Sequence, residues 1–319
     1  MHILVTNDDG PPNAESSPYV LPFVRTLEDA GHTVSVILPD TQRSWIGKAH
    51  IVGQDVQATH YWPPKANPDV HSPTTSSAPD DGTHPWILVN STPASCAQLG
   101  LSQMFFQDRP KIDLVISGPN YGRNTTAVFA LSSGTLGAAL EAAVCGYRAI
   151  AVSFAFFDRQ NIPEVVAESC KQGMKVCEWL AKNGTWGEGR LFSVNVPLRQ
   201  DVMEKKVVWT EILQNQWLKG ACFQELPATN AVDDPAAEEA NLRRQESNGG
   251  AESGTVTEEA SKWKHRHFKW APRFTDVYDA VLQAGPGSDG WAVKEGETSV
   301  TAIRANFMHA EPTNGEIKL

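Results

Sequence analysis

The residues MHILVTNDDG at positions 1–10 decide the fold class, because an apolar run ends in an amide, two carboxylates and a glycine. Ile3, Leu4 and Val5 are consecutive apolar residues, which is typical of a strand buried on both faces of a parallel sheet. The polar residues that follow would lie at the carboxyl end of this strand, where ligands bind in open α/β sheets. Two carboxylates there are candidate ligands for a divalent cation, although Asn, Asp and Gly are also the usual residues of a simple turn.

Strand and helix patterns alternate downstream of this turn as far as residue 198. Ser17 and Pro18 are typical of an N-cap and a first helical turn, and this helix is expected to stop at Gly31. Thr92 and Pro93 are expected to cap a second helix in the same way. Further strands are expected at residues 33–38, 86–90, 112–117, 149–153 and 191–196, with helices between them that include 132–144 and 164–182. We therefore predict an α/β fold over residues 1–198, a Rossmann-like three-layer sandwich with a mainly parallel sheet. The motif GxGxxG does not follow the first strand, which argues against a dinucleotide cofactor.

Residues 199–319 have a different pattern and are predicted to form a C-terminal extension. Two strand-like stretches at 206–213 and 298–307 favour a β-hairpin that packs on the main domain or on another subunit. Residues 228–261 have the composition of a flexible insertion, and residues 62–85 that of a surface excursion near the site. The basic and aromatic run at 262–270 could bind bases or nucleic acid, but a solvated strand face is the more common use of such a run.

Composition narrows the function classes. The formal net charge of −10 and the pI near 5.4 argue against stable nucleic-acid binding and against an anionic membrane surface as partner. A phosphorylated small molecule remains compatible, since a bound metal would reverse the local charge. An odd number of cysteines, five, without CxxC spacing favours reduced, buried thiols. The chain shows neither a signal sequence nor a membrane span, so a cytoplasmic protein is expected.

Polar residues also follow other predicted strands. Ser44 ends the loop PDTQRS at 39–44, and Asn120 and Asn124 lie in SGPNYGRN at 117–124. Ser132 to Thr135 begin a helix of small residues, and a helix N-terminus with hydroxyl side chains is a candidate anion site. An ordinary surface hydroxyl at Ser44 and an ordinary Ser/Thr cap on the helix are the alternatives. If the strands are parallel, all these groups gather at one edge of the sheet.

The four segments NDDG, PDTQRS, SGPNYGRN and SSGTLGAALEAA (132–143) resemble the SurE family, the survival-protein nucleotidases, in order and in spacing. STPASCAQLGL at 91–101, NVP at 195–197, TDVYDA at 275–280 and SVTAI at 299–303 are also similar to family segments. The resemblance covers most of the chain outside residues 60–85 and 214–265. NDDG alone is a weak motif, but its combination with SGxNxGxN and SGT is highly specific.

The resemblance implies a divalent-metal-dependent phosphomonoesterase that hydrolyses nucleoside 5′- and 3′-monophosphates and other small phosphate esters, with Mg²⁺ or Mn²⁺ as cofactor. It also implies a homodimer or homotetramer formed through the C-terminal hairpin. By the resemblance, Asp8 and Asp9 are catalytic. The metal ligands are expected to be Asp8, Asp9, Ser44 and Asn120, and the phosphate contacts Asn124, Ser133, Gly134 and Thr135. Three residues depart from the family pattern: Trp45 stands where a small glycine is usual, Ser132 replaces a usual aromatic, and Pro119 lies inside the SGxN loop.

Several mechanisms remain open at this point. Attack on phosphorus could come from a water molecule activated at the metal or from one Asp carboxylate. Adjacent strand residues point to opposite faces, so both carboxylates can contact one ion only if the chain has left strand geometry by Asp8. A phosphate-accepting switch domain would need a third Asp at a later strand end, where Ser117 to Asn120 stand instead. A nucleotide-binding regulatory module without turnover is the remaining alternative.

Overall fold

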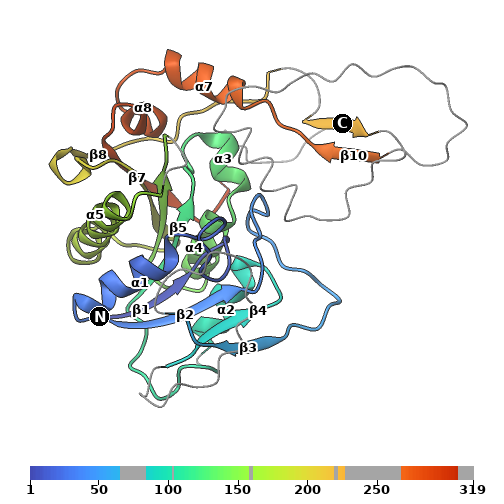
Figure 1. Cartoon of the computed structure of the whole chain (residues 1–319), viewed down its shortest axis with the longest axis vertical. Coiled ribbons are helices and arrows are strands. Elements are labelled where there is room, and N and C mark those ends of the chain that lie inside the picture. The colour runs from blue at the N-terminus through green and yellow to red at the C-terminus, as the bar shows by residue number, and fades with distance from the viewer. Residues whose placement is uncertain (65–83, 103, 158–160, 219–221, 227–266, 308–319) are drawn as a thin grey trace, which may run out of the picture.

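The computed structural model describes residues 1–64, 84–102, 104–157, 161–218, 222–226 and 267–307 (Figure 1). The predicted insertion at 228–261 lies outside the described residues. Most of the predicted excursion at 62–85 and residues 262–266 of the basic and aromatic run also lie outside them.

A nine-stranded sheet forms the centre of the protein. Its strands, in spatial order, are β3 (Ala58–Tyr61), β4 (Trp86–Val89), β2 (Thr33–Pro39), β1 (His2–Thr6), β5 (Leu114–Tyr121), β6 (Ala149–Ala155), β7 (Arg190–Pro197), β11 (Thr298–Arg304) and β8 (Val207–Trp209). The six strands from β4 to β7 are parallel, as predicted, whereas β3 and β11 run antiparallel to their neighbours β4 and β7. The parallel strands place their carboxyl ends at one edge, with β1 near the middle.

Helices cover both faces of the sheet (Figure 1). Helices α1 (Val20–Asp29) and α5 (Pro163–Asn183) pack together over one face, and α2 (Pro93–Leu101) and α4 (Gly134–Val144) pack together over the other. Ile3 and Val5 belong to the first apolar layer, and Leu4 belongs to the second. Strand β1 therefore has apolar neighbours on both sides, which explains why its sequence does not alternate. The predicted Rossmann-like three-layer fold is confirmed.

The predicted ends of two helices have different outcomes. Thr92 and Pro93 begin α2 as expected, with the Thr92 hydroxyl accepting a hydrogen bond from the Ser95 amide. The N-cap predicted at Ser17 is wrong, because α1 begins at Val20 and follows Tyr19. The Ser17 hydroxyl instead donates to the carbonyl oxygen of Gly10 at 2.9 Å. It is part of the first turn of the chain rather than of the helix.

The C-terminal extension contains an antiparallel hairpin, but not between the two stretches from which it was predicted. β8 and β11 are parallel neighbours at the end of the main sheet. The chain between them includes helices α7 (Phe274–Gln283) and α8 (Asp289–Lys294), a connection long enough for the crossover that parallel strands require. The hairpin pairs β9 (Phe223–Leu226) with β10 (His267–Trp270) in a separate small sheet. Residues 267–270 of the basic and aromatic run thus form a strand, which agrees with the alternative to nucleic-acid binding given for this run.

The cysteines are free thiols, as expected, but they are not all buried: Cys145 is exposed and Cys222 is half-buried. None of the helices in the described ranges is both long enough and apolar enough to cross a membrane.

Candidate functional site

The first turn leaves strand geometry immediately after β1. The side chain of Asn7 bridges the turn, accepting from the Gly10 amide at 3.0 Å and donating to the Gly10 carbonyl oxygen at 2.9 Å. Gly10 has a φ of +85°, a conformation that suits glycine. Asp8 and Asp9 are held within this bridged turn, each only 2% exposed. Strand β1 ends at Thr6, so the chain has left strand geometry by Asp8, as a site shared by both carboxylates would require.

The two carboxylates are anchored on different elements. Oδ1 of Asp8 accepts a hydrogen bond from the Thr135 hydroxyl at 2.5 Å, and Oδ2 of Asp9 accepts one from the Tyr121 amide at 2.7 Å. The carbonyl oxygen of Asp8 also accepts from the Arg43 amide at 2.7 Å. The turn thus contacts the start of α4, the end of β5 and the loop after β2.

Helix α4 begins directly against the first turn. A Cβ atom added at Gly134 would lie 2.7 Å from Cβ and 2.9 Å from Oδ2 of Asp8, and 3.1 Å from the Arg43 carbonyl oxygen. Only glycine allows the helix to approach this closely. The Ser133 hydroxyl caps α4 by accepting from the Leu136 amide at 3.1 Å. The ordinary Ser/Thr cap, which was the alternative to an anion site, is present, and Gly134 and Thr135 lie beside Asp8.

Strand β5 continues four residues beyond the stretch 112–117 predicted from its apolar pattern, ending at Tyr121. Its pairing with β6 shifts register between Ser117 and Asn120, and a Cβ atom at Gly118 would lie 2.0 Å from the Val152 carbonyl oxygen. The Asn120 side-chain amide donates to the Gly122 carbonyl oxygen at 2.8 Å. This bond uses the nitrogen of the Asn120 side-chain amide and fixes the orientation of that group.

Asn124 is fixed by the next two strands rather than by the first turn. The backbone amide of Asn124 donates to Oδ1 of Asn195 at 2.8 Å, and its side-chain amide donates to the Ser153 hydroxyl at 2.8 Å. Asn195 is fully buried, and its own Nδ2 has no hydrogen-bond partner among the residues that the structure describes. Asn195 was not predicted as a site residue, although it is a polar residue at the carboxyl end of β7 and the rule used for the other strands applies to it.

Asp289 supports the same region from the C-terminal extension. Its buried carboxylate accepts from the amides of Thr126 and Leu213, each at 3.0 Å. Burial raises the pKa of Asp289, and the backbone hydrogen bonds it accepts oppose that rise. The contact joins residues 163 positions apart, so no local pattern in the sequence indicates it.

Trp45, which follows Ser44, has a left-handed backbone with a φ of +62°. This conformation is rare for a bulky residue and suits the glycine that the family pattern has here. The Trp45 ring packs against Phe129 of helix α3 (Ala127–Ser132) and against Trp270 and Phe274, at centroid distances of 5.6, 6.0 and 6.0 Å. The Ser44 loop is therefore in contact with the C-terminal extension through an aromatic cluster.

The oxygen atoms at this edge suit a hard divalent cation. Two buried carboxylates, a hydroxyl and an amide carbonyl are the ligand types that Mg²⁺ and Mn²⁺ prefer. Burying two adjacent carboxylates also favours a compensating positive charge. Within the described ranges, no group of three or more His, Cys, Asp and Glu residues that could hold a metal is found. The proposed set contains only two such residues, and its other two oxygen donors are Ser44 and Asn120.

These features define a class: Rossmann-like α/β proteins whose strand-end loops gather acidic, amide and hydroxyl groups beside a helix N-terminus. The family profile described as "Survival protein SurE" matches residues 3–219. The chain belongs to the SurE family.

Individual relatives agree with this assignment. The chain is 30% identical to "5'-nucleotidase SurE" of Prochlorococcus marinus (strain NATL1A), over 68% of this chain and 72% of that protein. It is 31% identical to "Probable tubulin--tyrosine ligase PBY1" of Saccharomyces cerevisiae, over its full length but only 43% of the yeast protein. A crystal structure of the SurE protein from Aquifex aeolicus has the same fold, with a TM-score of 0.61, 21% identity and coverage of 97% of this chain and 95% of that one.

Proposed function

We propose that this protein is a divalent-metal-dependent phosphomonoesterase that hydrolyses nucleoside monophosphates and other small phosphate esters. The observation that carries the proposal is the contact of the Asp8–Asp9 turn with the Ser44 loop, the end of β5 and the start of α4. The SurE relatives named as 5'-nucleotidases support the reaction class. The yeast protein's name is not carried over, since this chain spans less than half of that protein.

The metal ligands in this proposal are Asp8, Asp9, Ser44 and Asn120. When bound, Mg²⁺ or Mn²⁺ supplies positive charge that draws electron density from the phosphoryl group. Thr135 holds one oxygen of Asp8, and the Tyr121 amide holds one oxygen of Asp9. These bonds orient the carboxylates before substrate arrives, which lowers the cost of reorganisation during the reaction.

Phosphate is proposed to bind at the start of α4 and beside Asn124. The first amides of a helix attract anions, and Ser133, Gly134 and Thr135 form the start of α4. Asn124 is held by Asn195 and Ser153, so its position is fixed by two strands. Because Thr135 donates to one carboxylate and Asn124 to Ser153, their side chains act first as supports, and the α4 amides are the stronger candidates for direct phosphate contact.

Release of inorganic phosphate tests the proposal. The assay uses a panel of nucleoside 5′- and 3′-monophosphates and an aryl phosphate, with Mg²⁺, with Mn²⁺ and with a chelator. We expect chelation to abolish turnover and Asp9→Asn to reduce it by about 100-fold or more. Loss of a group that only supports a metal ligand typically costs about 10- to 100-fold, and loss of a ligand itself should cost at least the upper end of that range. Asp29→Asn is a matched control, because Asp29 is an exposed residue at the end of α1.

Hydrolysis that persists without metal, or in Asp9→Asn, would contradict the mechanism. A wild-type protein that binds nucleoside monophosphate but releases no phosphate from any member of the panel would favour the regulatory alternative.

A further inference from the structure

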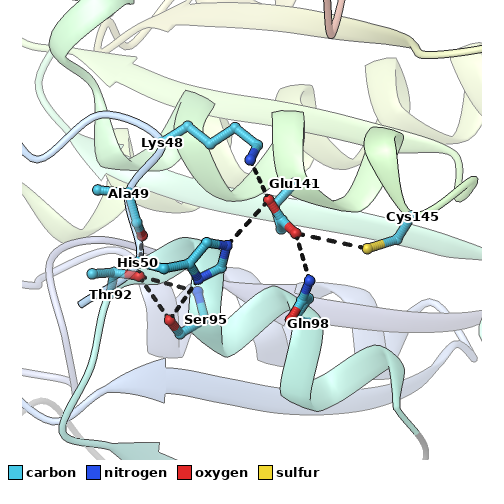
Figure 2. Close-up of polar contacts among 8 residues, drawn as sticks. All are labelled: Lys48, Ala49, His50, Thr92, Ser95, Gln98, Glu141 and Cys145. Carbon is cyan, nitrogen blue, oxygen red and sulfur yellow. Dashed lines mark hydrogen bonds and ion pairs between the residues drawn. The ribbon is translucent and has the colours of Figure 1, made fainter. Parts of the chain in front are cut away.

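Glu141 of α4 is a buried carboxylate with contacts to two other elements (Figure 2). It is 3% exposed, and its Oε2 lies 2.5 Å from Nζ of Lys48 and 3.4 Å from Nε2 of His50. Its Oε1 accepts from the Gln98 side chain of α2 at 2.9 Å. The carboxylate therefore joins α4 to α2 and to the loop after β2.

The loop after β2 is the one that carries Ser44. Lys48 and His50 follow Ser44 by four and six residues. Between Ser44 and Lys48, the Gly47 amide donates to the Ser132 carbonyl oxygen at 2.9 Å, and a Cβ atom at Gly137 would lie 2.2 Å from the Gly47 carbonyl oxygen. Backbone thus packs on backbone, and the Glu141 ion pairs lie at one end of this tight contact.

The other end of the same contact is the first turn. The Arg43 amide donates to the Asp8 carbonyl oxygen, and Thr135 of α4 donates to the Asp8 carboxylate. Ser44 therefore lies between two fixed points, Arg43 at the Asp8 turn and Gly47 at the start of α4. These two contacts restrict the path of the loop along the helix.

We propose that Glu141 is a positioning residue: it holds the Lys48–His50 end of the loop on α4 and so sets where Ser44 stands relative to Asp8. The role of Ser44 in this inference rests on the proposed function. Glu141 lies two helical turns from Gly134 and acts only through the loop and the helix.

The charges of the cluster fit this role. Burial alone would raise the pKa of Glu141, but Lys48 and then His50 outweigh that effect and lower it. A buried carboxylate that stays ionised holds its cationic partners strongly, because removing one partner leaves an uncompensated charge. Lys48 and His50 both come from the Ser44 loop, so this attraction is directed at the loop rather than at α2.

The test compares three variants in the metal-free and Mn²⁺-loaded protein. Glu141→Gln removes the charge and keeps the shape, and Lys48→Met removes the nearer of its two partners on the loop. Gln98→Ala is the matched control, because it removes a contact of the same carboxylate to α2, on an exposed side chain that water can replace. The measurements are hydrogen exchange of the Arg43 and Gly47 amides without metal, and the Mn²⁺ dissociation constant by calorimetry.

We expect Glu141→Gln and Lys48→Met to accelerate exchange at Arg43 and Gly47 and to weaken Mn²⁺ binding tenfold or more, the range for groups that support a metal ligand. Gln98→Ala should change neither quantity by more than about twofold. The inference is wrong if Glu141→Gln lowers only the melting temperature and leaves both quantities at wild-type values.

The two proposals fail differently. If the wild-type protein neither binds Mn²⁺ nor releases phosphate, the proposed function fails, while the exchange of Arg43 and Gly47 still decides whether Glu141 positions the loop.

Discussion

Replacing Gly134 by alanine should displace Asp8 without removing any polar group. The added Cβ would lie 2.7 Å from the Asp8 Cβ, whereas ordinary contacts begin at 3.4 Å. The Arg43 carbonyl oxygen at 3.1 Å hinders a shift of the helix toward the Ser44 loop. The turn and the helix must therefore separate by roughly 1 Å, and misplacement of catalytic groups by about 1 Å can cost about 100-fold in rate.

A matched control is available in α5. A Cβ atom at Gly173 would meet its nearest neighbours, ring carbons of Phe154 and Phe23, at 3.4 Å, which is an ordinary contact. Gly173→Ala should therefore be tolerated, and alanine's better helix propensity is worth about 1 kcal/mol in a helix interior. Gly134→Ala should instead lose about 1–3 kcal/mol through overpacking.

The assay is kcat and KM for phosphate release at saturating Mn²⁺, together with urea unfolding of both variants. We expect a fall in kcat of about 100-fold for Gly134→Ala and wild-type kinetics for Gly173→Ala. Wild-type turnover by a folded Gly134→Ala protein would refute the reasoning, because it would mean that the position of Asp8 against α4 does not matter for the reaction.

Three further predictions concern stability and reactivity. Asp289→Asn should lower the free energy of unfolding by about 1.5–3 kcal/mol in urea denaturation, since an amide cannot accept the backbone hydrogen bonds on both sides that the carboxylate accepts. The difference in unfolding free energy between wild type and Glu141→Gln should be constant near neutral pH and shrink as the pH falls below about 4.5. The folded-state pKa of Glu141 is lowered, and its carboxylate contributes to stability only while it is ionised. A difference that is unchanged at pH 3 would contradict this. A thiol reagent should label exposed Cys145 in the native protein, as mass spectrometry would show. Three cysteines should react only after unfolding, since burial removes access and raises their pKa: Cys96, Cys170 and Cys177.

Much of the fold follows from local patterns in the sequence. The unbroken apolar run at residues 3–5 predicts a strand with neighbours on both faces, and β1 has them. The Thr92–Pro93 cap follows from the same kind of local chemistry. Parallel pairing then requires the carboxyl ends of β1, β2 and β5 to share an edge, which is why Arg43 contacts Asp8 and Tyr121 contacts Asp9 although these residues are far apart in the chain.

Predictions failed where local pattern and long-range pairing differ. The stretches at 206–213 and 298–307 have the composition of strands, but composition does not determine whether two strands pair in parallel or antiparallel. The strands within these stretches pair in parallel in the main sheet. Ser17 has the chemistry of an N-cap, yet the nearby Gly10 carbonyl oxygen binds its hydroxyl. In both cases a partner that is not adjacent in sequence decides the outcome.

The sequence by itself determined the α/β class, the strand-end position of the acidic turn and the family to which the chain belongs, because these depend on short patterns and their order. Only the tertiary structure decided which groups hold the site: Tyr121 on Asp9, Thr135 on Asp8, Asp289 on Thr126, and Glu141 on the Ser44 loop. The physical reason is that a buried carboxylate accepts hydrogen bonds from the donors that the fold brings close to it. Proximity in the folded chain does not depend on separation along the sequence.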